Sequence, residues 1–267
     1  MEKYLEKYDT FERIIVFKFS TGHGGIGDIL KGFTYLLQLC IENNIRLYYA
    51  LANNIIDKYL KLRHSKMYIS MDKIFDPQYN IDIISLRTIE EVSGIESGAI
   101  YLAQPQLVHP VENLYDKISY SLEDIFEFSE EVIGKANDFI GGKYRSIHLR
   151  MGDKYLETDK AFIVCSSDAR SYNEDAIFRC IESQGNIVFF CDNNEYKLKM
   201  KAKYPRINIT DYDIGHTSLA NTTEQEILNA VTEFYILAHS EYIYAASNSG
   251  FSMMASKFKG VPIMALE

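Results

Sequence analysis

Segments that fit short β-strands alternate with segments that fit α-helices along almost the whole chain of 267 residues. The first strand-like run, Arg13 to Phe19, is followed by a glycine-rich turn and by an amphipathic helical stretch from Asp28 to Asn44. A helix between two strands returns the chain to the same end of the sheet, so such strands pair in parallel. The sequence therefore predicts an α/β fold.

The second half of the chain shows this alternation most regularly. Its expected elements are strand 144–149, helix 173–184, strand 186–191, helix 195–203, strand 206–210, helix 223–239, strand 241–246, helix 249–257 and strand 261–265. Thr223 and Glu226 have the spacing of a capping box at the start of their helix. Pro262 predicts an edge position for the last strand, because proline cannot donate a ladder hydrogen bond.

The region between residues 46 and 140 is less regular. We expect strands at 46–50, near 67–70, at 81–85 and at 99–102, a short helix at 53–61 and an acidic helix over 121–139. The glycine pair Gly141-Gly142 precedes a new strand and is the best candidate for a boundary. The chain is therefore expected to form two Rossmann-type halves, residues 1–140 and 141–267, with a cleft between them.

Charge and hydropathy exclude some classes of function. Lys plus Arg number 28 and Asp plus Glu number 37, so the net charge is −9, which argues against a nucleic-acid binder. The longest uncharged stretches, 97–111 and 242–256, are too short to span a bilayer, and the N-terminus lacks the apolar core of a secretory signal. The four cysteines form no CxxC pair. These features predict a reduced, cytoplasmic protein without stable membrane insertion.

The first motif is the glycine-rich turn GHGGIGD at residues 22–28, between the first strand and the first helix. Gly24, Gly25 and Gly27 would let the backbone approach a ligand, and the helix start favours anionic groups. The dinucleotide version of this turn also needs an acidic residue at the end of the second strand, where residues 48–53 read YYALAN. An NAD site is therefore a weaker interpretation than a tight corner or a loop for another ligand.

The second motif is HLRMGDK at residues 148–154, at the carboxyl end of an expected strand. Ligands of open α/β sheets bind outside the carboxyl ends of strands, and the planar fork of Arg150 suits a phosphate. Asp153 could orient Arg150 or stabilise the turn. The alternative interpretation is a surface ion pair between Arg150 and Asp153 beside a core histidine, His148.

The third motif is SNSGFS at residues 247–252, where a strand runs into a helix. Asn248 and Ser249 offer polar donors to a phosphate, or they simply cap the helix. Asp211-Tyr-Asp213 has the DxD form that holds a metal in some glycosyltransferases. We interpret these two acids as solvated loop residues and expect no metal site.

In this order, the motifs resemble those of GT-B fucosyltransferases that share an H-x-R-x-G/T-D signature. The glycine turn at 22–28 resembles their GGxGNQ segment, with Asp28 where Asn is usual. HLRMGDKY at 148–155 matches the signature, and FFCDNNEYKLK at 189–199 resembles the strand end and helix that follow it. The stretch from Glu233 to Ser252 resembles their last motif. The resemblance spans most of the chain except residues 50–140.

The resemblance implies an inverting, metal-independent transfer of fucose from GDP-fucose to an oligosaccharide held by the N-terminal half. Arg150 would then hold the β-phosphate of GDP, and His148 and Glu233 would lie near the guanine. Asp192 would face the nucleotide side of the cleft, and Ser249 would bond a phosphate oxygen. The C-terminal half would be the nucleotide-sugar-binding domain.

The acceptor hydroxyl also needs a proton acceptor or a very electrophilic sugar. Glu157 is the first candidate for a catalytic base, and Asp153 is the second. Three alternatives remain open: a GT-B transferase for another GDP- or UDP-linked sugar, an NAD-dependent oxidoreductase, and a non-catalytic module that binds a nucleotide or carbohydrate. Such a module would keep Arg150 but would need no base.

Overall fold

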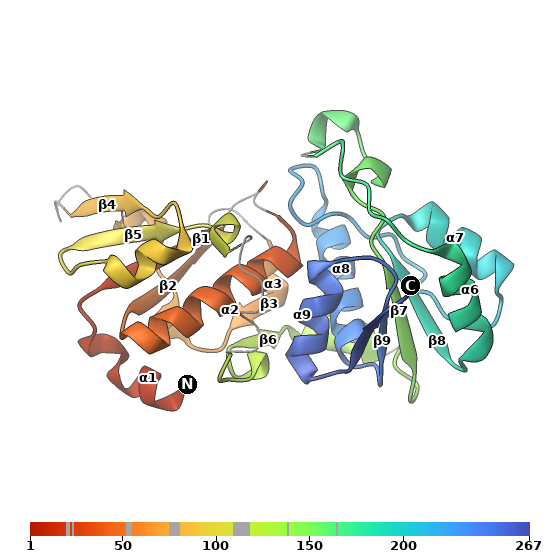
Figure 1. Cartoon of the computed structure of the whole chain (residues 1–267), viewed down its shortest axis with the longest axis horizontal. Helices are drawn as coiled ribbons and strands as arrows, with labels where there is room; N and C mark the ends of the chain where they lie inside the picture. The colour runs from red at the N-terminus through yellow and green to blue at the C-terminus, as the bar shows by residue number, and fades with distance from the viewer. Residues whose placement is uncertain are drawn as a thin grey trace.

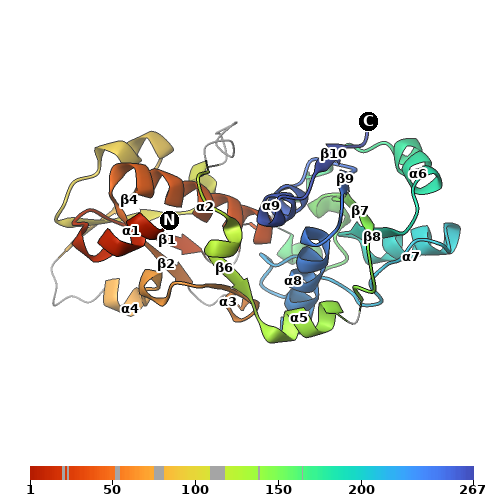
Figure 2. The ribbon, with the colours of Figure 1, turned by 90° about the horizontal axis from the view of Figure 1, so that it is seen from below.

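Two four-stranded parallel sheets, one from each half of the chain, form the framework of the molecule (Figures 1 and 2). The computed structural model describes residues 1–19, 22, 24–51, 55–74, 81–108, 118–137, 139–163 and 165–267. The strand orders are β2-β1-β5-β4 and β10-β9-β7-β8, and every pair within these two sheets is parallel. The predicted α/β class is confirmed, and β10 lies at the edge that Pro262 predicted.

The first half contains the glycine turn and the helix that follows it. Its helices and strands are α1 (Glu2–Lys7), β1 (Ile14–Phe19), α2 (Ile26–Asn43), β2 (Arg46–Leu51), α3 (Ile56–Tyr59), β3 (Leu60–Leu62), α4 (Met71–Ile74), β4 (Asp82–Ser85), β5 (Ala99–Ala103), β6 (Phe126–Phe128) and α5 (Glu130–Asn137). Short 3-10 turns lie at Tyr8–Thr10, Ser65–Met67, Ile89–Gly94, Pro105–Val108 and Leu122–Asp124. The antiparallel pair β3–β6 stands apart from the parallel sheet.

The second half contains β7 (Arg145–Leu149), α6 (Glu174–Ser183), β8 (Ile187–Cys191), α7 (Asn194–Lys203), α8 (Glu224–Ala238), β9 (Ile243–Ala245), α9 (Gly250–Lys259) and β10 (Ile263–Ala265), with 3-10 turns at Asp153–Tyr155 and Lys160–Phe162. Alternate residues of β8 face opposite sides. Ile187, Phe189 and Cys191 pack with residues of α6 and α7. Val188 and Phe190 join the core that contains α8 and α9. Burial of both faces explains why this strand is apolar throughout.

Helices of the second half also pack against the first half. Phe33 of α2, Phe234 of α8 and Phe258 of α9 belong to one continuous core. The ring of Phe128 in β6 lies 5.0 Å from that of Phe258 and 6.2 Å from that of Phe234. Figure 1 shows α2 running from the first half toward α9. This packing holds the start of α2 beside the second sheet.

Four expected elements differ from the structure. The helix expected at 53–61 ends at Tyr59, and the chain continues as the strand Leu60–Leu62. The strand expected near 67–70 is a 3-10 turn followed by a single bridge between Tyr68 and Tyr49, and the strand expected at 206–210 is reduced to a bridge between Asn208 and Val188. The helix expected over 121–139 is wrong in its first half, because residues 126–128 form β6 against β3. Tertiary pairing with β3 overrides the local preference of that acidic segment.

The joint between the halves falls near the glycine pair at 141–142. These glycines follow α5 and precede β7, so the two parallel sheets lie on either side of them in the chain. However, α5 packs against α8 of the second half. The boundary after residue 140 therefore stays a prediction. No helix in the described part of the chain is both long enough and apolar enough to cross a membrane.

Candidate functional site

The site begins where neighbouring parallel strands end. His148 of β7 is paired with Phe190 of β8 and with Ala245 of β9, so the residues that follow these strands meet at one edge of the sheet. The backbone N–H of Arg150 donates to Ser247 Oγ at 2.9 Å, and this hydroxyl donates to the Arg150 carbonyl at 2.8 Å. These bonds fix the turn from which the Arg150 side chain extends.

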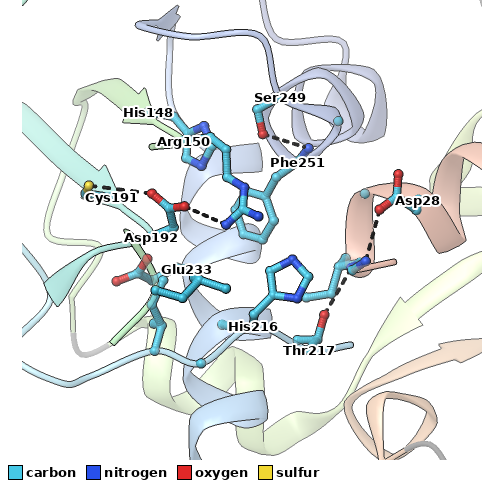
Figure 3. Close-up of a pocket in the computed structure, with 18 of the residues that line it drawn as sticks. Asp28, His148, Arg150, Cys191, Asp192, His216, Thr217, Glu233, Ser249 and Phe251 are labelled. Atoms are coloured by element: carbon cyan, nitrogen blue, oxygen red, sulfur yellow. Dashed lines mark hydrogen bonds and ion pairs between the residues drawn. The ribbon is translucent and has the colours of Figure 1, made fainter. Parts of the chain in front are cut away.

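A cavity of about 850 Å³, counting the solvent at its mouth, lies between this edge and the start of α2 (Figure 3). It is lined by residues 25–28, by the ends of β7 and β8, by the loop at 214–217, by α8 and by residues 248–251. The predicted ligand-binding residues that line it are Gly25, Gly27, His148, Arg150, Asp192, Glu233, Asn248 and Ser249. Both halves of the chain thus contribute walls to one cleft.

Two helix starts converge on this cavity. Gly27 in the first turn of α2 lies so close to α9 that a Cβ atom there would be 2.6 Å from the Gly250 carbonyl carbon. The backbone N–H of Ile26 donates to Thr217 Oγ1 at 3.2 Å, which ties the glycine turn to a loop of the other half. Ser249 caps α9 by accepting from the Phe251 N–H at 3.2 Å. Since helix N-termini carry partial positive charge, both favour an anion in the cavity, and at the start of α2 the Asp28 carboxylate already accepts the Gly25 N–H at 3.0 Å.

The guanidinium of Arg150 is held by carboxylates. It bonds Asp192 at 2.5 Å and also bonds Asp153, while Asp168 lies 3.8 Å away. Asp192 in addition accepts the backbone N–H groups of Met151 at 2.7 Å and Gly152 at 3.2 Å. The two carboxylate bonds use two of the five N–H donors of a guanidinium. Arg150 is therefore a pre-oriented fork with donors left for a ligand.

Two histidines line the cavity. His148 is 5% exposed and stacks on Phe251 with ring centroids 5.2 Å apart, and burial together with the charge of Arg150 lowers its pKa to about 3. Burial and Arg150 also lower the pKa of His216 to about 4, although Asp153 and Asp168 oppose the shift. Its Nδ1 lies 2.7 Å from Ser218 Oγ. Both rings are therefore neutral at pH 7 and suit hydrogen bonds rather than ion pairs.

A buried carboxylate forms another part of the lining. Glu233 of α8 is 1% exposed, and its Oε1 accepts hydrogen bonds from the Thr210 hydroxyl and from Lys197 Nζ, the latter at 3.1 Å. The pKa of Glu233 is raised, because burial outweighs the lowering by Lys197 and by the Thr210 hydrogen bond. A carboxylate held in this way can accept hydrogen bonds from a ligand in the cleft.

Solved structures resemble the chain over nearly its whole length. Fucosyltransferase NodZ from Bradyrhizobium matches with a TM-score of 0.59 and 13% identity over 96% of each chain. Arabidopsis thaliana FUT1, as a mutant in complex with GDP, matches with 0.59 and 11% over 99% of this chain and 74% of its own, and POFUT1 in complex with GDP matches with 0.57 and 9% over 96% and 99%. The chain has the fold of these fucosyltransferases. No model of a protein family and no curated protein matches the sequence.

The GT-B fold that the motifs predicted is confirmed by these fucosyltransferase structures. Three predicted site residues do not line the cavity of this fold. Gly24, with φ of 105°, makes the turn, and a Cβ there would meet the Asp28 carboxylate. Asp153 is buried against Arg150. The exposed Glu157 accepts the first N–H groups of α7, from Asn194 at 2.8 Å and Glu195 at 2.7 Å. A role as base stays a prediction for both acids.

Sequence reasoning missed several residues of the site, of which three are polar or charged and come from loops. His216 and Thr217 stand in a loop without a motif, and Arg170, whose Nε lies 2.8 Å from Asp168, comes from the long loop after β7. Only the fold reveals their position in the cleft. The acids of the DxD pattern, Asp211 and Asp213, are exposed, and the described residues contain no cluster of three or more His, Cys, Asp or Glu arranged for a metal.

Proposed function

We propose that the chain is a glycosyltransferase that moves fucose from GDP-fucose to a hydroxyl group of a glycan, with inversion and without a metal ion. The observation that carries the proposal is the cleft in which a fixed arginine and two helix starts converge beside a buried carboxylate. NodZ and POFUT1, whose fold the chain shares, have been crystallised with GDP and GDP-fucose. The donor GDP-fucose, the inverting transfer without a metal ion and the glycan acceptor are all proposals for this chain.

The diphosphate is the leaving group of this reaction, so negative charge grows on the β-phosphate as the glycosidic bond breaks. Arg150 is oriented before the ligand arrives, and the starts of α2 and α9 add backbone donors and positive dipole ends. Loss of one such donor costs about 10²- to 10³-fold in rate. In this proposal, stabilisation of the leaving group supplies most of the catalysis.

The guanine base is proposed to lie toward Glu233. Guanine presents two neighbouring N–H donors, N1–H and the 2-amino group, which suit an ionised carboxylate. Uracil has one N–H between two carbonyl oxygens, which an ionised carboxylate would repel. His148 and Phe251 form a stacked pair in the same cavity and would contact the nucleotide on another side.

The acceptor glycan is proposed to approach from the N-terminal half, next to the glycine turn. Asp153 and Glu157 are the candidates for accepting the hydroxyl proton. However, each carboxylate already accepts hydrogen bonds, from Arg150 or from the backbone of α7, which weakens it as a base. A sugar made strongly electrophilic by departure of the diphosphate needs little help from a base. We therefore propose that a catalytic base contributes less to the rate than stabilisation of the leaving group does.

A panel of nucleotides tests the donor. Thermal unfolding with GDP, UDP and NAD should show stabilisation by GDP, which amounts to about 2.7 kcal/mol when GDP is present at about 100 times its dissociation constant. Stabilisation by NAD alone would contradict the proposal and favour an oxidoreductase. Preference for UDP would point to a transferase for a different sugar. Adding EDTA should leave the result unchanged.

A second assay tests catalysis. GDP-fucose is incubated with the protein, with and without a panel of glycans, and release of GDP is followed by chromatography. Arg150→Lys is the variant to compare, because it keeps the positive charge but loses the planar fork. Binding of GDP without any hydrolysis or transfer would indicate a non-catalytic module.

A further inference from the structure

Lys197 is a buried cation directly behind the cavity. It belongs to α7, whose neighbouring Lys199 and Lys203 are exposed, yet Lys197 is only 2% exposed. Its Nζ donates to Glu233 Oε1 at 3.1 Å, to Thr210 Oγ1 at 3.1 Å and to the Tyr212 carbonyl at 2.9 Å. An ammonium group has three N–H donors, so all of them are used.

A buried ion pair of this kind is expected to add little to the stability of the fold. Taking two charges out of water costs free energy that their mutual attraction often only balances, and apolar replacements of a buried pair are frequently neutral or stabilising. The pair here has one member on the cavity and one behind it, because Glu233 lines the cavity and Lys197 does not. With that geometry, the cation behind the cavity can control whether the carboxylate that faces a ligand is ionised.

We propose that Lys197 is a positioning residue that keeps the Glu233 carboxylate ionised and oriented, and thereby selects a base with two adjacent N–H donors. The inference rests on the proposed function, in which the nucleotide is GDP. Two bonds converge on Glu233 Oε1, from Lys197 and from Thr210, and these limit rotation of the carboxylate. Tyr212 anchors the ammonium from the loop on the other side.

The ionisation state of Glu233 decides what the cavity accepts. Burial raises the pKa of Glu233 above its usual value even with Lys197 in place, and Lys197 is the strongest influence that lowers it. Two other titratable groups interact with Glu233: the thiol of Cys191 at the end of β8 and the phenol of Tyr212. Burial raises the pKa of both, so they stay neutral. Without Lys197, Glu233 would hold a proton and donate a hydrogen bond, where the N1–H and 2-amino edge of guanine offers donors rather than an acceptor.

The test compares Lys197→Met with Lys199→Met, a control on the exposed face of the same helix. Dissociation constants are measured by calorimetry for GDP and for inosine diphosphate, which lacks the 2-amino group, between pH 6 and 9. We expect Lys199→Met to match the wild type. Lys197→Met should lose about 10- to 100-fold in GDP affinity at neutral pH, with the preference for GDP over inosine diphosphate largely abolished.

The pH dependence separates charge control from a general loss of structure. In Lys197→Met, GDP affinity should recover as the pH rises through the raised pKa of Glu233, whereas the wild type should stay flat over this range. Lys197→Arg keeps a cation and should keep the preference for GDP even if it unfolds more readily. Equal loss of preference in the Arg and Met variants would overturn the inference, as would an unchanged preference in Lys197→Met.

A measurement on the wild type covers the case in which Lys197→Met fails to fold. Carbon NMR of protein labelled at the glutamate carboxyls, with the Glu233 signal assigned through Glu233→Gln, should show an ionised carboxylate from pH 6 to 8. A signal of the protonated acid at pH 7 would overturn the inference while leaving GDP binding intact. Failure of the wild type to bind GDP would instead overturn the proposed function, and this inference with it.

Discussion

The contact between the starts of α2 and α9 can be tested from both sides. A Cβ atom on Gly27 would lie 2.6 Å from the Gly250 carbonyl carbon and 2.7 Å from the Phe251 nitrogen, both of which are backbone atoms. A Cβ atom on Gly250 would lie 3.7 Å from the Gly27 carbonyl carbon, an ordinary contact. Alanine should therefore be harmful at position 27 and tolerated at position 250.

The expected size of the difference follows from the geometry. To reach an ordinary contact of 3.4 Å from 2.6 Å, the backbones must separate by about 0.8 Å. Forcing an extra carbon into a packed site costs about 1–3 kcal/mol. Both substitutions also gain stability because alanine has a higher helix propensity than glycine, and this gain largely cancels when the two variants are compared. Gly27→Ala should thus be less stable than Gly250→Ala by about 1–3 kcal/mol.

Urea unfolding of the two variants measures this difference, and GDP binding measures its effect on the cleft. Because Gly27 and Gly250 both line the cavity, separating the helices moves two donor sites apart. We expect Gly27→Ala to bind GDP about tenfold or more weakly, since shifted hydrogen bonds to a charged group lose about 1.5 kcal/mol or more. Equal stability of the two variants would refute the close approach of the helices on which this reasoning depends.

Three further predictions concern charged and titratable groups. Arg150→Ala should lower the free energy of unfolding by about 3–5 kcal/mol even without ligand, because it leaves the carboxylates of buried Asp153 and half-buried Asp192 without their cation. Thermal unfolding checks this, and a loss below about 1 kcal/mol would contradict it. Glu157→Gln should destabilise the start of α7 by about 0.3–1 kcal/mol and leave fucose transfer nearly unchanged, whereas a catalytic base would cost about 10²- to 10⁴-fold in transfer rate. The pKa of His148 is about 3 in the folded chain. Because that pKa is depressed, stability should fall by about 2 kcal/mol as the pH drops from about 7.5 to 5, and His148→Phe should reduce this loss in urea titrations.

The half of the site that comes from strand ends could be predicted from the sequence. Asp192 directly follows the apolar run IVFFC, and Arg150 follows the mixed run YRSIHL; both runs have the length of a strand, and parallel pairing brings their ends together. Asn248 and Ser249 follow a third such run. A local pattern combined with one rule of sheet topology is sufficient for these positions. The prediction depends on which segments form strands, so small errors in the bounds of those strands do not change it.

The remainder depends on contacts that no local pattern encodes. His216 reaches the cavity because its loop is tied to the glycine turn through Thr217 and Ile26, 191 positions apart in the chain. Lys197 stands in a helix whose Lys199 and Lys203 are exposed, and only packing against Glu233 distinguishes it from them. Likewise, no pattern in the sequence shows that Glu157 accepts the first N–H groups of α7, and its role as a base stays a prediction. Roles set by long-range packing cannot be derived from spacing along the chain.

The proposed binding of a diphosphate by an acidic chain does not require a positive net charge. Arg150 and Arg170 pair with three carboxylates, those of Asp153, Asp168 and Asp192, so two positive and three negative groups give this cluster a net charge of −1. The carboxylates act by holding the guanidinium in place, and the helix starts add partial charges that need no counterion. Because these donors are already fixed in position, little free energy is spent on reorienting them when negative charge moves to the leaving group. A basic patch would attract any polyanion, whereas this arrangement favours one small anion in one orientation.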